Sequence, residues 1–422
     1  MSAAEVVVIV GAGLAGARAA ETLRGNGFAG SIVMFGDEPT APYHRPPLSK
    51  SLLVDEPEMS TLLVHPEGWY HDHDVELRLG RKIARVDVSS RRLQDVLGHS
   101  HRFDKLILTT GAAARTFEGS RSDAQSRVLV LRTLSDAARL RTQLATAQSV
   151  VVVGGGFIGA EVASGAVGLG HSVTILETAE GPFLRSLGGA ASKILSSFYR
   201  SEGIVLVTSV NIASVCESED SVTVTATDGR RWDADLVVMG IGAVPADELA
   251  ADSGLSTGNG VQVDAHGRTT VPFVFAAGDV ANRFEPTLGR HIRPEHWQNA
   301  QNHAVAGARN VLGANEAFSE VPWFWSDQFS VNLQMAGVPY AVDEVVVRGV
   351  PDDRRFSIFY LSRSRVVAAF SMDNARDIGV AKRMIGRRIA VDAAALADEG
   401  TDLKSLLRVR EEQVFASSKR TE

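Results

Sequence analysis

The sequence contains a single cysteine, Cys216, among 422 residues. A disulfide needs two sulfurs and an iron–sulfur cluster usually needs four thiolates, so the chain supplies neither from its own residues. Any electron carrier must therefore be a bound organic group or a partner. Cys216 lies in the alternating segment 213–224, and we expect it to be a small buried apolar residue rather than a reactive thiol.

Strong charge of one sign and long apolar runs are also missing. The formal net charge is -7, which gives no overall attraction to nucleic acid or to an anionic membrane. No stretch approaches the roughly 18 consecutive apolar residues of a membrane span. Residues 1–5 show no export signal. We therefore expect a cytoplasmic protein that binds neither nucleic acid nor membrane.

The composition that is present suits a large globular enzyme. Hydrophobic residues make up 45% of the chain and charged residues 22%, which argues against disorder or a fibrous repeat. A chain of 422 residues exceeds what one hydrophobic core usually serves. Two or three domains are expected.

A first glycine-rich motif, Gly11-Ala-Gly-Leu-Ala-Gly16, follows the apolar run 6–10 and precedes a helical pattern. The first glycine permits a tight turn, the second lets backbone amides approach a pyrophosphate, and the third allows close helix packing. The phosphate charge then meets the positive end of the helix. The next expected strand, 31–35, leads to Asp37 and Glu38, either of which can accept hydrogen bonds from a ribose.

A second motif, Gly154-Gly-Gly-Phe-Ile-Gly159, follows the apolar run 149–153. The strand expected at 172–176 delivers Glu177, and no Lys or Arg stands directly after it to meet a 2′-phosphate. NADH is therefore favoured over NADPH. One such motif could be a structural turn, but two copies with flanking strands and acids favour two dinucleotide sites.

Further apolar segments suggest that the first domain is interrupted by the second. Strands are expected at 105–111 and 235–242, on either side of the second motif. Another strand, 273–279, ends in glycine and an acid, as at the carboxyl edge of a nucleotide-binding sheet. From Pro322 the pattern changes to aromatic residues and alternating segments, which indicates a smaller α+β domain.

Several more specific motifs accompany the two glycine turns. They are Arg45-Pro-Pro-Leu-Ser-Lys50, Leu131-Arg-Thr133, Ala277-Gly-Asp279, Trp297-Gln-Asn-Ala300 and Trp323-Phe-Trp-Ser-Asp327. In this order, and over nearly its whole length, the chain resembles the FAD-dependent ferredoxin reductases of bacterial oxygenase systems. That family has the glutathione-reductase-like fold without its redox disulfide, in agreement with the single cysteine.

The resemblance implies an α/β fold of two Rossmann-type dinucleotide-binding domains and a C-terminal α+β domain. We predict a discontinuous FAD-binding domain at 1–112 and 245–321 and an NADH-binding domain at 113–244. The C-terminal domain is predicted at 322–415, and residues 416–422 are predicted to be a disordered tail.

The same resemblance, read beside the motifs, implies a set of cofactor-binding residues. For FAD they are Gly11, Gly13, Leu14, Ala15, Gly16, Asp37, Glu38, Arg45, Lys50, Ile83, Thr110, Gly111, Arg132, Gly278, Asp279, His296, Trp297 and Trp325. For NADH they are Gly154, Gly156, Phe157, Ile158, Gly159, Glu161, Glu177 and Gly242. Asp37 is favoured over Glu38 for the ribose, and Arg45 is an additional phosphate partner. Trp297 and Trp325 could otherwise be core aromatics.

Lys50 and Glu161 are the predicted catalytic residues. The resemblance places the lysine near the flavin N5 edge and pairs it with the glutamate of the nicotinamide-side helix. A cation there would favour reduced flavin, and the carboxylate could orient the nicotinamide. Composition alone would make them a surface lysine and a helix-face glutamate.

The implied activity is hydride transfer from NADH to FAD, followed by two single-electron transfers to a 2Fe–2S ferredoxin that supplies an oxygenase. Two alternatives remain open: an NADH-sensing flavoprotein resembling apoptosis-inducing factor, and an NADH oxidase. The protein is expected to be a monomer or homodimer, with no metal. Because ferredoxins are usually acidic, basic residues are candidates for the docking face. They are Arg290, Arg293, Arg354, Arg355, Lys382, Arg383, Arg387 and Arg388.

Overall fold

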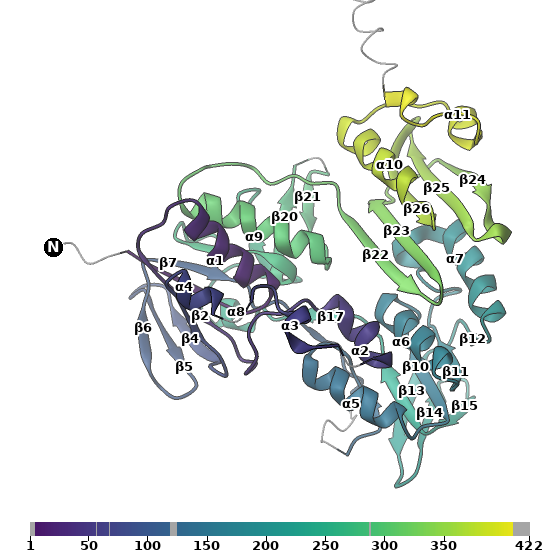
Figure 1. Ribbon diagram of the computed structural model, residues 1–422, viewed down its shortest axis with the longest axis horizontal. Helices are drawn as coiled ribbons and strands as arrows, with labels where there is room; N and C mark the ends of the chain where they lie inside the picture. Colours follow the sequence, from purple (N-terminus) through teal and green to yellow (C-terminus); the bar gives the residue numbers. More distant parts are fainter. Residues whose placement is uncertain (1–4, 56, 67, 119–124, 287, 408–422) are drawn as a thin grey trace, which may run out of the picture. The chain divides into compact units, whose positions relative to one another are not determined.

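The computed structural model describes residues 5–55, 57–66, 68–118, 125–286 and 288–407 (Figure 1). The predicted tail at 416–422 lies outside these residues. The chain divides into two compact units. The first combines Met1–Pro47, Asp55–Ala114 and Ala243–Ser319, and the second combines Leu48–Val54, Arg115–Gly242 and Glu320–Glu422. Among the described residues, no helix is long and apolar enough to cross a membrane.

The first unit is built on a parallel sheet with the strand order β19-β7-β1-β2-β3. Its strands are β1 (Val6–Val10), β2 (Ser31–Phe35), β3 (Val75–Arg78), β7 (Lys105–Leu108) and β19 (Val274–Ala276). Because β1 is central and covered on both faces, its residues are apolar without interruption. The predicted strands at 6–10 and 31–35 are confirmed.

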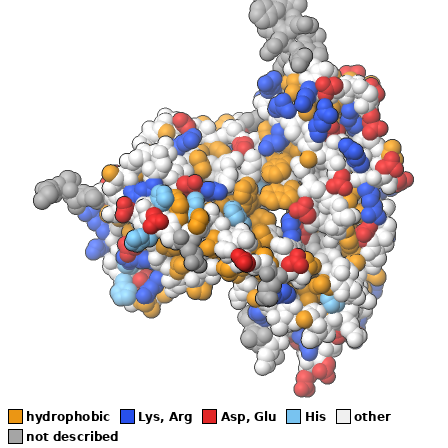
Figure 2. All heavy atoms as spheres, viewed as in Figure 1, with side chains coloured by type: hydrophobic (Ala, Val, Ile, Leu, Met, Phe, Trp, Pro, Cys, Tyr) orange, Lys and Arg blue, Asp and Glu red, His pale blue; other side chains and the backbone are white. Residues whose placement is uncertain are grey.

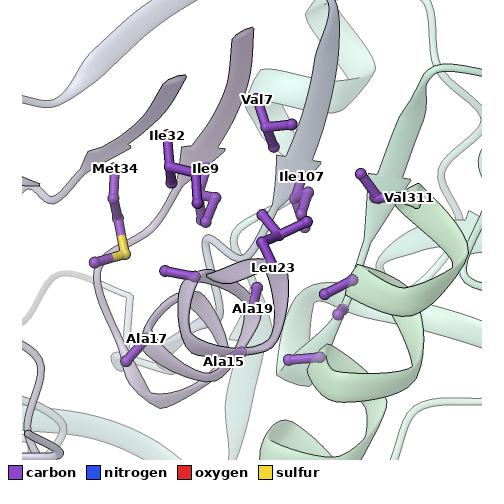
Figure 3. Close-up of a cluster of buried hydrophobic side chains, with 14 of the residues drawn as sticks. Val7, Ile9, Ala15, Ala17, Ala19, Leu23, Ile32, Met34, Ile107 and Val311 are labelled. Carbon is purple, nitrogen blue, oxygen red and sulfur yellow. The ribbon is translucent and has the colours of Figure 1, made fainter. Parts of the chain in front are cut away.

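Successive residues of β1 enter two different cores, since neighbouring side chains of a strand point to opposite faces. Val7 and Ile9 pack against α1 (Leu14–Gly25) and α9 (Trp297–Val311), as Figure 3 shows. Val8 and Val10 face the other core. Full burial of Leu23 from α1 stabilises the first core by about 1.5–3 kcal/mol.

Short elements complete the first unit. Antiparallel sheets are formed by β4 (Ile83–Asp87), β5 (Arg92–Asp95) and β6 (Ser100–Arg102), and by β8 (Ala112–Ala114) with β17 (Ala243–Pro245). A mixed sheet contains β18 (Val261–Val263), β20 (Ala281–Glu285) and β21 (Arg290–Ile292). The remaining α-helices are α3 (Met59–Leu62), α4 (Trp69–Asp72) and α8 (Glu248–Asp252).

The second unit repeats the parallel arrangement, with the strand order β12-β11-β10-β16-β9. Its strands are β9 (Val128–Leu129), β10 (Ser149–Val153), β11 (Ser172–Leu176), β12 (Val205–Val207) and β16 (Leu236–Met239). The associated helices are α2 (Ser51–Val54), α5 (Leu134–Leu144), α6 (Phe157–Gly168) and α7 (Leu184–Ser201). The strands predicted at 149–153 and 172–176 are confirmed.

One prediction about this unit is wrong. Cys216 is exposed, whereas the alternating pattern led us to expect a buried side chain. It lies on β13 (Ile212–Glu217), at the edge of the antiparallel sheet β13-β14-β15 with β14 (Val222–Ala226) and β15 (Arg231–Ala234). A register shift between Ile212 and Ser214 interrupts the pairing of β13 with β14. Such a shift changes which side chains face the core.

The second unit also contains an antiparallel sheet with the order β22-β23-β26-β25-β24. Its strands are β22 (Trp323–Gln328), β23 (Val331–Gly337), β24 (Glu344–Val350), β25 (Arg355–Ser362) and β26 (Arg365–Met372). Helices α10 (Ala375–Arg387) and α11 (Ala393–Ala397) share its core. This is the α+β character expected from Pro322 onward, although the three-domain boundaries themselves remain a prediction.

Candidate functional site

The first glycine turn connects β1 to α1. A Cβ atom on Gly11 would lie 2.1 Å from the Thr109 carbonyl oxygen, and one on Gly16 would lie 2.1 Å from the Gly11 oxygen. Both positions therefore require glycine for packing. A Cβ on Gly13 would meet no described atom within 4 Å, and no described side chain caps α1 at this residue. The turn therefore leaves space and backbone N–H groups for an anion such as pyrophosphate.

The two acids that follow β2 are in different environments. Glu38 accepts hydrogen bonds from Tyr43 Oη at 2.7 Å and from Arg45 Nη2 at 2.8 Å. Asp37 is exposed, and its Oδ1 accepts a bond from the Glu38 backbone N–H at 3.0 Å. Pairing with Arg45 competes with a ribose for Glu38, which supports the preference for Asp37. The same ion pair means that Arg45, the predicted phosphate partner, is already bonded to a carboxylate.

The strand ends of the first unit converge beside this turn. Gly278, two residues after the end of β19, has a φ of 78°, and a Cβ there would lie 3.0 Å from the Ala15 side chain. Asp279 therefore follows a segment that lies against the start of α1. This arrangement matches the carboxyl edge at which parallel sheets bind nucleotides.

Three further predicted FAD residues also belong to the first unit. Thr110 donates a hydrogen bond to the Ala246 carbonyl at 2.6 Å, and Gly111 has a φ of 73°. Both follow β7 and are partly exposed. Ile83 is buried at the start of β4. Their contacts with FAD stay predictions.

His296 and Trp297 occupy the start of α9. Burial lowers the pKa of His296 to about 4, while the Asp279 carboxylate acts in the opposite direction. His296 is therefore neutral near pH 7 and does not provide a cation. The indole N–H of Trp297 donates to His44 Nδ1 at 3.0 Å. Burial, assisted by Arg18, lowers the pKa of His44, which keeps it an acceptor.

The second glycine turn, in the second unit, repeats the geometry of the first. A Cβ on Gly154 would lie 2.4 Å from the Gly240 oxygen, and one on Gly159 would lie 2.1 Å from the Gly154 oxygen. A Cβ on Gly156 would meet its nearest described atom only at 3.9 Å. No described side chain caps α6 at Gly156. This turn can also accept a pyrophosphate.

The flanks of the second turn contain the other predicted NADH residues. Phe157 packs against Phe183 and Phe324 with ring-centroid distances of 4.6 and 4.4 Å. Ile158 is 41% exposed, so one apolar side chain at the start of α6 faces outward. Gly242 has a φ of 99°, which suits glycine.

Glu177 lies directly against the second turn. Its Oε2 accepts a hydrogen bond from the Gly155 N–H at 2.7 Å, and its Oε1 accepts one from the Ala179 N–H at 2.8 Å. The carboxylate is therefore fixed at the end of β11. A carboxylate at this position can accept hydrogen bonds from ribose hydroxyls, and its negative charge repels a 2′-phosphate.

Lys50 and Glu161 form an ion pair within the second unit. Lys50 Nζ and Ser326 Oγ donate to Glu161 Oε1, and Ser49 Oγ donates to Oε2. The Glu161 side chain is 6% exposed and that of Lys50 is 19% exposed. Burial raises the pKa of Glu161, whereas the Lys50 charge and the three hydrogen bonds oppose that rise. Removing one partner of such a buried pair typically costs about 3–5 kcal/mol.

Trp325 and Arg132, both predicted to contact FAD, belong to the second unit. Trp325 stacks on Trp323 with a centroid distance of 5.4 Å, and its N–H donates to Asp327 Oδ2 at 3.2 Å. The Arg132 backbone N–H donates to Asp136 at 3.0 Å. Their roles toward FAD remain predictions.

The sequence reasoning missed Ser49 and Ser326. Ser49 lies in the motif Arg45–Lys50, directly before Lys50, and Ser326 lies in the motif Trp323–Asp327, directly after Trp325. A serine in a motif carries no sign that its hydroxyl faces a carboxylate distant in the chain. Only the packing of α6 against α2 and β22 revealed the two contacts with Glu161.

The predicted docking cations are not equivalent. The Arg293 side chain is 7% exposed and pairs with Glu295, so it is a structural cation rather than a docking residue. Arg354 pairs with Glu202 at 2.5 Å, and Lys382 lies over the Trp323 ring at 5.3 Å. The remaining candidates are exposed: Arg290, Arg355, Arg383, Arg387 and Arg388. Figure 2 shows Lys and Arg side chains, interspersed with acids, over the part of the second unit that contains α10.

Comparisons with known proteins agree with this geometry. Residues 5–304 match the family model for pyridine nucleotide-disulphide oxidoreductases, and residues 323–407 match the reductase C-terminal model. The ferredoxin–NAD(+) reductase component of the anthranilate 1,2-dioxygenase system of Burkholderia cepacia is 39% identical over 405 residues, covering 96% of this chain and 100% of the relative. Rhodocoxin reductase of Rhodococcus erythropolis is 36% identical over 399 residues, covering 94% and 93%.

A solved structure gives the same result. The reductase in the covalent putidaredoxin reductase–putidaredoxin complex has a TM-score of 0.92 at 33% identity, covering 97% of this chain and 100% of that chain. The predicted resemblance and fold class are confirmed. The chain belongs to the pyridine nucleotide-disulphide oxidoreductase family, in the branch of ferredoxin–NAD(+) reductases that has a reductase C-terminal domain.

Proposed function

We propose that this protein oxidises NADH and delivers the electrons, through FAD, to a 2Fe–2S ferredoxin that supplies an oxygenase. The observation that carries the proposal is the pair of glycine turns, one in each compact unit, each open at its central glycine. An acid follows the next strand in both units. Relatives named as ferredoxin–NAD(+) reductase components of dioxygenase systems support ferredoxin as the electron acceptor.

FAD and NAD(H) are the cofactors of this family. When bound, FAD accepts a hydride from NADH and releases electrons singly, which is chemistry that no side chain of this protein offers. The first turn fits FAD because the open face of Gly13 meets the positive end of α1. Asp37 would hold the adenosine ribose, and Asp279 would approach from the segment that follows β19.

NADH would occupy the second turn. Gly156 leaves room for the pyrophosphate, and Glu177 is held in position by two backbone N–H groups. These contacts order Glu177 before any nucleotide arrives, so little side-chain entropy remains to be lost on binding. The fixed negative charge supports a preference for NADH over NADPH.

Lys50 and Glu161 are the residues that we assign to the reacting edge of the cofactors. The glutamate holds the lysine ammonium in one orientation, because their charges meet where little water reaches. A fixed ammonium stabilises negative charge that develops beside it without reorganisation during the reaction. Neither residue has to transfer a proton.

The electrons must leave the protein for a partner. The whole chain contains one cysteine, so it can form no internal disulfide to receive them. Three of the exposed cations among the predicted docking residues lie close together in sequence, on and directly after α10: Arg383, Arg387 and Arg388. Charge reversals there that leave the ferredoxin KM unchanged at low salt would remove this docking assignment.

The proposal is tested by turnover with a ferredoxin encoded near the reductase gene. After a visible flavin spectrum confirms bound FAD, NADH-dependent cytochrome c reduction is measured with and without the ferredoxin. Fast reduction that requires ferredoxin supports the proposal. Slow turnover with a long-lived charge-transfer complex would indicate an NADH sensor instead, and rapid oxygen consumption without ferredoxin would indicate an oxidase.

The proposal includes a cytoplasmic location, because NADH is supplied there. Cell fractionation checks this point, and recovery of the protein outside the cytoplasmic fraction would contradict it. A monomeric or homodimeric state is likewise a prediction, which size-exclusion chromatography with light scattering measures directly.

A further inference from the structure

A chain of hydrogen bonds leads from α7 to the carboxylate of Glu161. Tyr199 Oη donates to Gln328 Oε1 at 2.5 Å, and Gln328 Nε2 donates to Ser326 Oγ at 2.9 Å. Ser326 Oγ then donates to Glu161 Oε1 at 2.5 Å. Tyr199, Gln328 and Ser326 are each at most 1% exposed, so solvent does not compete along the chain.

The hydrogen bonds between Tyr199 and Glu161 can be donated in only one direction, toward Glu161. If Glu161 were protonated and donated to Ser326, the Gln328 amide would turn round and Tyr199 would become an acceptor. The Tyr199 proton would then need another acceptor, and among the described residues its hydroxyl bonds only to Gln328. Burial raises the pKa of Tyr199 well above its usual value, so the phenol keeps its proton. Each donor is therefore directed toward Glu161.

The direction of these hydrogen bonds matters because a second carboxylate, that of Asp327, competes with Glu161 for the Lys50 ammonium. Lys50 Nζ lies 3.9 Å from Asp327 Oδ2, and the Asp327 side chain is 49% exposed. In the part of the protein that the structure describes, the charged groups that face Glu161 and Lys50 are each other and Asp327. The neutral Tyr199 stands at the far end of the hydrogen-bond chain. Without a fixed Glu161, the ammonium can move toward the more hydrated Asp327.

We propose that Tyr199, Gln328 and Ser326 are positioning residues that hold the Glu161 carboxylate, through a one-directional hydrogen-bond chain, as the acceptor for the Lys50 ammonium. The inference deepens the proposed function and rests on its assignment of Lys50 and Glu161. None of the three positioning residues needs to touch FAD or NADH. Their effect reaches the cofactors only through the charge and orientation of the ion pair.

The test compares Tyr199→Phe with the matched variant Tyr360→Phe. Tyr360 is also a buried tyrosine of the second unit, but its hydroxyl donates to the Leu187 carbonyl and is not part of the chain. Infrared difference spectra of the FAD-loaded proteins are recorded across pH. The protonated-carboxyl band of Glu161 is identified by its absence in Glu161→Gln.

We expect Tyr199→Phe to shift the midpoint of this band upward by about half to one pH unit, because the chain loses its terminal donor. The acid limb of flavin reduction by NADH should move by the same amount. Tyr360→Phe should move neither. Ser326→Ala should give a larger shift, and Ser326→Thr, which keeps the hydroxyl, should restore the midpoint toward that of the original protein.

An unchanged midpoint in Tyr199→Phe, or an equal shift in Tyr360→Phe, would overturn the inference. If Tyr199→Phe does not fold or retain FAD, Gln328→Met is measured instead. This variant removes the hydrogen bond from Gln328 to Ser326, and the same shift in the midpoint is expected. The infrared measurement needs no ferredoxin. A shifted midpoint in a protein that reduces no ferredoxin would therefore refute the proposed function while leaving the positioning chain intact.

Discussion

The central glycine of the second turn allows nucleotide binding to be tested without disturbing the fold. Gly156 has φ and ψ of -85° and -175°, which alanine adopts without strain, and its added methyl group would be 3.9 Å from the nearest described atom. The methyl group would nevertheless occupy the open face at the start of α6. Gly156→Ala should therefore weaken nucleotide binding and change stability by less than about 1 kcal/mol.

The expected magnitude follows from the contacts that the methyl group would displace. Backbone N–H groups at a helix N-terminus make charge-assisted hydrogen bonds to a pyrophosphate, each contributing about 1.5–3 kcal/mol. Partial loss of two of them should cost about 2–3 kcal/mol, or about 30- to 140-fold in Kd. Calorimetric titration with NAD(+) measures this directly, and the FAD content should remain unchanged.

The chain provides a matched control and a reciprocal variant. Gly168 ends the same helix and has no described atom within 4 Å of an added Cβ, so Gly168→Ala should leave NAD(+) binding intact. Gly13→Ala in the first turn should lose FAD, whereas Gly25→Ala at the end of α1 should keep it. A Kd for NAD(+) within twofold of the original value in Gly156→Ala would refute the assignment of the second turn.

Three other perturbations probe the site and the fold. Glu161→Gln should slow flavin reduction by NADH at least about tenfold in stopped-flow experiments while FAD is retained, because Lys50 loses its buried counter-charge; an unchanged rate and flavin potential would contradict this role. Glu177→Gln should raise the KM for NADH and reduce the preference over NADPH, each by about tenfold, as initial rates would show. Burial, assisted by Arg283, lowers the pKa of His303 to about 3, so the unfolded chain binds a proton below about pH 6.5 that the folded protein excludes. Stability should fall as pH decreases from about 6.5 toward 3, and His303→Leu should reduce this slope in denaturant titrations; an identical slope would contradict the assignment.

The strands that position both turns could be predicted because buried parallel strands are continuous apolar runs bounded by glycine. The expected strands at 105–111, 235–242 and 273–279 are present but shorter, ending at Leu108, Met239 and Ala276. The predicted strands were too long because the residues that follow each strand were counted as part of it. Those residues leave the ladder and form the loops of the carboxyl edge.

Side-chain environments were less predictable than strands. Alternation made Cys216 look buried, but alternation does not specify which face of an edge strand is covered. Arg293 was interpreted as a surface cation, although its side chain is 7% exposed beside Glu295. Both errors concern packing between segments distant in the chain.

The sequence by itself determined the two glycine-rich strand-to-helix turns, because glycine spacing and the apolar runs beside it are local properties of the backbone. It also determined, through a single cysteine, that electrons cannot pass to an internal disulfide. Only the tertiary structure decided what surrounds Glu161. Ser49, Lys50 and Ser326 come from distant segments and meet this carboxylate because α6 packs against α2 and β22. Hydrogen bonds between such segments depend on packing, which no local pattern records.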